Sequence, residues 1–112
     1  MTTPILSFED FQKVDIRVGT VIEVQDFPKA RIPAYKLTID FGHLGLKKSS
    51  AQITTLYTKE SLLQKRVIAV INFEVKQIAN FKSECLVLGV QNDKDVVLLH
   101  PDSNVVNGTQ VL

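Results

Sequence analysis

Alternating hydrophobic and polar positions run along most of the chain and predict short β-strands. In residues 14–24 every even position is a β-branched residue, and most odd positions are polar residues or glycine. A period of two is typical of a strand with one buried face, so this run predicts a long first strand. We expect Gly19, in the middle of the run, to bend or bulge the strand.

The same reasoning predicts five further strands and two short helices. A second strand is expected over residues 35–41, where large apolar side chains alternate with polar ones. Ser7 can cap a helix that carries Phe8 and Phe11 on one face, and Thr58 can cap another helix over residues 58–65. The remaining strands are expected over residues 46–53, 66–73, 84–90 and 95–99.

Turn signals separate these elements. Two prolines between residues 27 and 33 break the strand pattern, and residues 91–94 are expected to join the last two strands. Asn107-Gly108 predicts a further turn. We also expect Asn80 to adopt a left-handed backbone conformation, which asparagine tolerates better than most residues do.

The order of the elements predicts an all-β fold. Three strands, a helix and then more strands is the order of a Greek-key barrel of the oligonucleotide-binding (OB) type, whose helix plugs one end between strands three and four. A β-sandwich is the alternative architecture, and the single helix in that position favours the barrel. With 112 residues, the chain is predicted to form one domain over residues 1–112, with a short helix near the amino terminus.

Cysteine content and hydropathy bear on the cellular compartment. A single cysteine excludes an internal disulfide, which fits a reducing compartment. Cys85 lies in an apolar run, so we expect a small core residue rather than a nucleophile. No segment has the pattern of a signal peptide or the length of a bilayer span, so we expect a cytoplasmic protein without membrane insertion.

Charge is distributed unevenly, although the net charge is only +1. Residues 29–82 carry ten basic and three acidic side chains, whereas residues 1–28 and residues 83–112 each carry a net charge of −3. A basic middle segment can form a polarised surface that attracts phosphate groups. The alternative is that folding scatters these charges over the whole surface.

Candidate catalytic groups are few. His43 lies in a predicted turn and His100 beside a proline, and neither has the spacing of metal ligands. Ser49 and Ser50 lack the glycines of a nucleophile elbow, and no glycine-rich phosphate loop is present. We therefore expect a binding protein without catalysis, metal or cofactor.

Two segments have the composition of a nucleic-acid site. Residues 47–52 combine two lysines, two serines and an amide, which suits a phosphate backbone. The alternative for this segment is a polar edge strand, on which lysine discourages aggregation. Residues 72–84 form a loop rich in polar groups, in which Phe73 and Phe81 either stack on bases or belong to the core.

Three motifs give the chain a family resemblance. Residues 15–19 (DIRVG), residues 72–84 (NFEVKQIANFKSE) and the pair of segments 96–101 and 107–109 resemble, in the right order, the tRNA-binding domain that is appended to some methionyl- and phenylalanyl-tRNA synthetases. Residues 27–34, 48–54 and 79–84 resemble the variants found in a branch of export-related chaperones. The resemblance implies a homodimer of OB barrels that binds tRNA, with a proposed role in holding unfolded or exported preproteins.

The resemblance also implies which residues contact tRNA. They are polar or basic residues of the third strand and of the second motif: Lys48, Ser49, Ser50, Asn72, Lys76, Lys82, Ser83 and Glu84. The chain departs from the family pattern at Asn80, where glycine is usual, and at Val75, where proline is usual. Gln77 and Ala79 stand where a basic residue is often found, which thins the positive charge.

Large apolar residues near the predicted turns and in the first predicted helix support an alternative function. A chaperone needs an exposed apolar patch, and the same patch can serve instead as a dimer interface. The candidate residues for this surface are Phe8, Phe11, Phe27, Ile32, Pro33 and Tyr35. The two functions are compatible, because polar and apolar sites can occupy different faces of one dimer.

Overall fold

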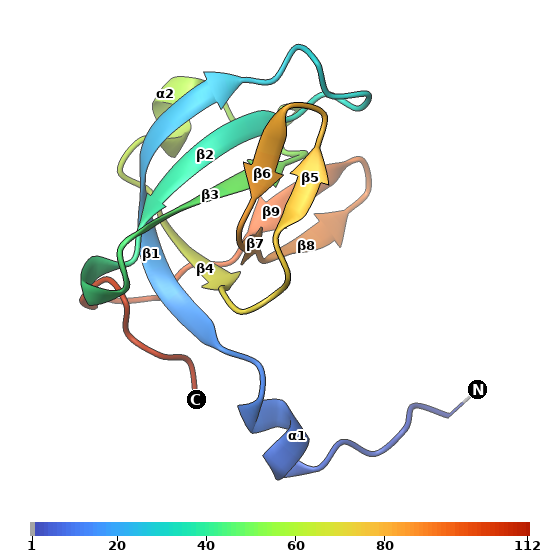
Figure 1. Ribbon diagram of the computed structural model, residues 1–112, viewed down its shortest axis with the longest axis vertical. Helices are drawn as coiled ribbons and strands as arrows, with labels where there is room; N and C mark the ends of the chain where they lie inside the picture. The colour runs from blue at the N-terminus through green and yellow to red at the C-terminus, as the bar shows by residue number, and fades with distance from the viewer. Residues whose placement is uncertain (1) are drawn as a thin grey trace.

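The structure, a computed structural model, describes residues 2–112. A short helix, α1 (Phe8–Gln12), precedes the barrel, and the Ser7 hydroxyl accepts a hydrogen bond from the Asp10 amide at its start, as predicted. Helix α1 and the extended residues before it project from the body of the molecule at one end of its long axis (Figure 1). No helix within residues 2–112 combines the length and the apolar content needed to cross a membrane.

A five-stranded antiparallel sheet curls into a nearly closed barrel (Figure 1). Its strand order is β3-β2-β1-β4-β7. The bounds are β1 (Ile16–Asp26), β2 (Tyr35–Asp40), β3 (Leu46–Ala51), β4 (Arg66–Val70) and β7 (Leu86–Val87). A 3₁₀ turn, η1 (Gly42–Leu44), joins β2 to β3. This is the OB barrel that the order of elements predicts.

The predicted irregularity in β1 is present, but not at Gly19. The register with β2 shifts between Val21 and Glu23, which marks a β-bulge around Ile22. Before the bulge Gly19 and Val21 face the core, Ile22 at the bulge is exposed, and after it Val24 packs against the core, so the even positions of β1 do not share one buried face. Gly19 is needed for packing instead, because a Cβ atom at this position would lie 2.6 Å from a methyl carbon of Ile39.

Helix α2 (Lys59–Leu62) closes one end of the barrel between β3 and β4, as predicted. The Thr58 hydroxyl accepts from the Ser61 amide, and the Ser61 hydroxyl accepts from the Thr58 amide, which forms a capping box. Leu62 is fully buried. The core that it joins is made of apolar residues from all the barrel strands, with Leu37, Ile39, Phe41 and Val67 among the most buried.

Hydrogen bonds between β3 and the segment before β7 close the barrel. The amide of Lys48 donates to the Glu84 carboxylate, at 2.9 Å, and the amide of Glu84 donates to the Lys48 carbonyl, at 2.7 Å. The Ser49 hydroxyl donates to the carbonyl of Cys85, at 2.9 Å. The seam between β3 and the segment before β7 is therefore made by polar groups, although it is partly buried.

Two hairpins differ from the predicted strands. Residues 72–84, expected as a loop, contain the hairpin β5 (Lys76–Ile78) and β6 (Phe81–Ser83), and Ala79 rather than Asn80 has the left-handed conformation, with φ of 53°. The predicted strand over residues 84–90 is divided into β7 and β8 (Gly89–Asn92). Strand β8 pairs with β9 (Asp95–Leu98) through the predicted turn. The strand predicted to reach residue 73 ends at residue 70.

Candidate nucleic-acid interface

A groove runs between the β1–β2 loop (residues 27–34) and the β5–β6 hairpin. Its volume is ≈ 580 Å³. Residues 29–32 and Ala34 line one wall, residues 76–79 line the other, and Ser50 and Gln52 at the end of β3 line the floor. Loops and strand faces in these positions are the ones that OB barrels use to bind oligonucleotides and oligosaccharides.

The two walls of the groove touch through aromatic side chains. The Phe27 ring, at the start of the β1–β2 loop, meets the Phe81 ring of β6 edge-on, with centroids 5.5 Å apart. The Lys36 ammonium lies 5.6 Å from the Phe27 centroid and 6.0 Å from the Phe81 centroid. The attraction between a cation and the ring faces holds Lys36 beside the contact. The loop and the hairpin are thereby joined into one surface.

Basic side chains gather around this surface without acidic partners. Lys29, Arg31 and Lys76 line the groove, and Lys36 lies over Phe81, which begins the strand that also carries Lys82. Within residues 2–112, the ion pairs are Lys13–Asp10, Arg17–Asp15 and Lys59–Asp26, so none of these groove cations is neutralised by a carboxylate. Unpaired cations on one side of a barrel attract phosphate groups.

Five of the predicted tRNA-contacting residues take part in closing the barrel: Lys48, Ser49, Ser50, Ser83 and Glu84. The amide of Ser50 donates to the Ser83 hydroxyl, at 3.2 Å, beside the paired main chains of Lys48 and Glu84. The Lys48 side chain is nevertheless exposed, on the outer face of β3. Ser49 is only 1% exposed and its hydroxyl is occupied. We therefore assign Ser49 to barrel closure and leave it out of the interface.

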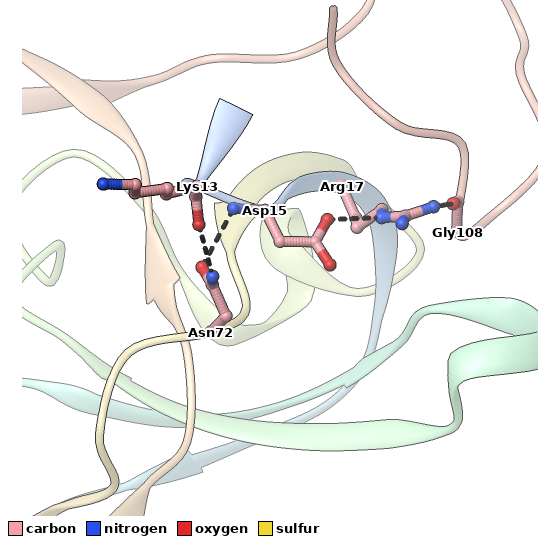
Figure 2. A network of polar contacts seen from close by, with 5 residues as sticks. All are labelled: Lys13, Asp15, Arg17, Asn72 and Gly108. Atoms are coloured by element: carbon pink, nitrogen blue, oxygen red, sulfur yellow. Dashed lines mark hydrogen bonds and ion pairs between the residues drawn. The ribbon is translucent and has the colours of Figure 1, made fainter. Parts of the chain in front are cut away.

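Asn72 holds the start of β1 against the end of β4 (Figure 2). Its side-chain oxygen accepts from the Asp15 amide at 2.9 Å, and its side-chain nitrogen donates to the Lys13 carbonyl at 2.7 Å. Arg17 continues the network by donating to the Asp15 carboxylate at 2.6 Å and to the Gly108 carbonyl at 2.9 Å. Residues of all three recognised motifs thus meet in this network, with Asp15 and Arg17 from the first, Asn72 from the second and Gly108 from the third.

We expect Asn72→Ala to loosen this anchor without weakening RNA binding. Both polar ends of the side chain already bind main-chain groups, so its loss should cost about 1–2 kcal/mol of stability. Hydrogen exchange at the Asp15 amide should accelerate. The affinity for tRNA should change less than about twofold, which is well below the tenfold change that 1.4 kcal/mol represents. A large loss of tRNA affinity with unchanged exchange would instead make Asn72 a contact residue.

The six residues of the predicted apolar surface do not lie together in the structure. Phe27 and Tyr35 are 5% and 9% exposed, so their assignment to the surface was wrong. Tyr35 points inward because it alternates with Leu37 on β2, and its hydroxyl donates to the Tyr57 carbonyl. Phe8 and Phe11 lie next to each other on α1, with ring centroids 6.4 Å apart, whereas Ile32 and Pro33 lie in the β1–β2 loop at the opposite end of the long axis (Figure 1). They form no common patch.

Sequence reasoning missed the contribution of the β1–β2 loop. Lys29 and Arg31 face the groove, but they were not among the predicted contacts. The available signal was two basic residues next to prolines in the loop that joins the first two strands of a predicted OB barrel. Lys36 was also missed, because its place beside Phe81 depends on the fold of the β5–β6 hairpin.

Cys85 is buried, as predicted. Burial raises the pKa of its thiol to about 12, and a hydrogen bond involving Ser49 opposes this shift only partly. A thiol with such a raised pKa is protonated at neutral pH and is a poor nucleophile. Among residues 2–112, no three histidine, cysteine, aspartate or glutamate side chains gather in a group that could hold a metal ion.

Known proteins share both the sequence and the fold. The profile of the family described as "Putative tRNA binding domain" matches residues 16–110. The crystal structure of the chaperone CsaA from Bacillus anthracis is 50% identical, with a TM-score of 0.91, over 97% of this chain and 100% of that one. The CsaA chaperone from Picrophilus torridus is also 50% identical, with a TM-score of 0.90, over 96% of this chain and 100% of that one.

A larger protein contains a related domain. The methionine–tRNA ligase of Pyrococcus horikoshii is 38% identical over 106 residues, which is 95% of this chain and 14% of the ligase. The chain thus spans about a seventh of the length of this curated relative. The family profile and the full-length match to two CsaA structures agree with the motifs recognised in the sequence. The chain therefore belongs to the tRNA-binding domain family, in its CsaA branch.

Proposed function

We propose that this protein binds tRNA without catalysis, through the basic surface around the groove. The observation that carries the proposal is the cluster of unpaired cations on both groove walls, with Lys29 and Arg31 on one and Lys76 on the other. Family membership supports tRNA as the ligand, since the matching profile is that of a tRNA-binding domain. We also propose a cytoplasmic location for the protein, which a tRNA ligand supports.

Electrostatics account for most of the binding in this proposal. Each lysine or arginine that meets a backbone phosphate releases condensed counterions, which favours association at low salt. Lys36, Lys48 and Lys82 extend the basic surface from the groove over the outer face of β2 and β3 and onto the hairpin. The hydrogen bond from the Ser50 amide to the Ser83 hydroxyl joins β3 to the β5–β6 hairpin, which keeps these cations at fixed distances from one another.

Salt dependence of tRNA binding tests the proposal. A filter-binding titration should give a plot of log affinity against log salt with a slope of about −4 to −5, as expected for about six phosphate contacts at roughly 0.7–0.9 each. A tRNA affinity that does not change with salt would mean that the basic surface is not the site. Undetectable binding at low salt would overturn the proposal altogether.

A homodimer is the second part of the proposal. Ile5 is fully exposed and Phe8 is 70% exposed on the arm that projects from the barrel (Figure 1). Apolar side chains exposed on a projecting segment are typical of a surface that a partner covers. A second copy of the chain would bury this arm and would present two basic surfaces to one folded RNA, which raises the overall affinity through avidity.

We expect the double change Ile5→Ser with Phe8→Ser to yield monomers. Light scattering at micromolar concentration should report the mass of one chain, against two for the unchanged protein. Leu63→Ser, which removes an exposed leucine next to α2, is the control and should leave the dimer intact. A dimer that persists in the double variant would exclude the arm as the interface.

A chaperone function has less structural support than tRNA binding. It required the six apolar residues of the predicted surface to form one patch, and two of them are buried while the rest lie at opposite ends of the molecule. The word chaperone in the names of the two CsaA structures describes those proteins. The geometry of the groove favours RNA as the ligand here.

A further inference from the structure

The groove offers two kinds of polar group, and they suit different parts of a nucleotide. Lys29, Arg31 and Lys76 are cations that donate hydrogen bonds and attract phosphates. Ser50, Gln52 and Gln77 are neutral, and each has a side-chain oxygen that can accept a hydrogen bond. The Gln77 nitrogen already donates to the Ala79 carbonyl at 2.8 Å, so its oxygen is the group that faces a base. Phosphate oxygens only accept, so a site for the backbone alone has no use for neutral acceptors. The edges of bases present both donors and acceptors.

The shape of the groove points the same way. The groove has a volume of ≈ 580 Å³ between two walls, which is within the range of about 300–1,000 Å³ for ligand-binding clefts. Base-paired RNA keeps its bases stacked inside a convex cylinder, whereas unpaired bases can be splayed into a pocket. Ile32 and Ile78 supply apolar surface on the two walls, against which a base face can pack.

Contacts of the β5–β6 hairpin with the β1–β2 loop and with β3 fix the distance between the groove walls before any ligand binds. The edge-on contact of Phe27 with Phe81 joins the β1–β2 loop to β6 at a centroid distance of 5.5 Å. The hydrogen bond from the Ser50 amide to the Ser83 hydroxyl joins the floor to the same hairpin. A site that is formed in advance loses little conformational entropy when it binds.

We infer that the groove takes unpaired nucleotides and selects them over base-paired RNA. This inference rests on the proposed function and names the part of the RNA that enters the site. Lys29, Arg31 and Lys76 hold the phosphates on either side of the inserted nucleotide. Gln52 and Gln77 bond to the edge of its base, while the cations outside the groove contact the surrounding backbone.

Competition among three RNAs tests the inference. Fluorescence anisotropy would compare three ligands: a tRNA, a single-stranded RNA of about eight nucleotides, and a blunt duplex of the same length. Eight nucleotides lie within the range of site sizes known for OB folds. The single strand should displace the tRNA and bind at least about tenfold tighter than the duplex. Duplex binding equal to that of the single strand, with tRNA still bound, would overturn the inference and leave the proposed function standing.

Gln52→Ala supplies an independent readout, because Gln52 is exposed and carries no charge. This variant should weaken single-strand binding about fivefold and leave the salt slope unchanged, since slope follows the number of phosphate contacts. Gln110→Ala, an exposed glutamine outside the groove, is the matched control and should behave as the unchanged protein. An unaltered affinity of Gln52→Ala for the single strand would contradict the proposed contact with a base. Failure of all three RNAs to bind would contradict the proposed function as well.

Discussion

Replacing Lys29, Arg31 and Lys76 together by alanine should weaken tRNA binding about 100-fold at low salt. The three side chains are the cations that line the groove, and each exposed contact to a phosphate contributes about 1 kcal/mol. A sum of about 3 kcal/mol corresponds to roughly two orders of magnitude in affinity. The slope of log affinity against log salt should become shallower by about two to three, at roughly 0.7–0.9 for each contact removed.

The control variant removes the same amount of positive charge, but at positions away from the groove. Lys13, Lys65 and Lys94 lie outside the groove lining, and their joint replacement by alanine also removes three positive charges. If binding depends on net charge alone, both triple variants should lose affinity equally. If it depends on the groove, as we expect, the control should retain most of its affinity and its salt slope.

Gly19→Val should unfold the protein or nearly so. The position faces the core, and even a Cβ atom would lie 2.6 Å from a methyl carbon of Ile39 and 2.8 Å from the Phe41 ring. Both neighbours are fully buried, so they cannot move aside without disturbing the rest of the barrel. Overpacking usually costs about 1–3 kcal/mol, and two further methyl groups raise the cost toward the 5–15 kcal/mol that holds a small domain folded.

Urea denaturation of a graded series measures this effect. Gly19→Ala should remain folded with a lower midpoint, whereas Gly19→Val should show little or no cooperative transition. Ile22→Ala, on the same strand but exposed at the bulge, should lose far less stability. A Gly19→Val protein as stable as Gly19→Ala would show that the packing around Ile39 yields more readily than we infer.

The order of strands and helices could be predicted because it depends on local signals. Residues close together in the sequence determine each of these signals: the period-two alternation, the helix caps at Ser7 and Thr58, and the turns near Asp93 and Gly108. The bulge in β1 could not be placed in the same way. It depends on how Val21 and Glu23 pair with β2, and a shift of one residue reverses which side chains face the core.

The candidate site was predicted only in part, for a related reason. Lys76 and Ser50 were expected from the motifs, but their place in one groove depends on a hairpin that was expected to be a loop. Asn72 was recognised as part of a motif, yet its role rests on partners 57 and 59 residues away in the sequence. Residue types identify a binding surface, and only tertiary contacts decide which of them remain free to bind.

Mapping the tRNA contact by amide hydrogen exchange tests the central claim most directly. On saturation with tRNA, we expect protection at residues 29–34, 48–52 and 76–83, which form the groove and the adjoining strand. A second hollow, lined by Lys65, Arg66 and residues 100–104, shares no residue with the groove and should show no change. Protection confined to that second hollow, with the groove unaffected, would contradict the account.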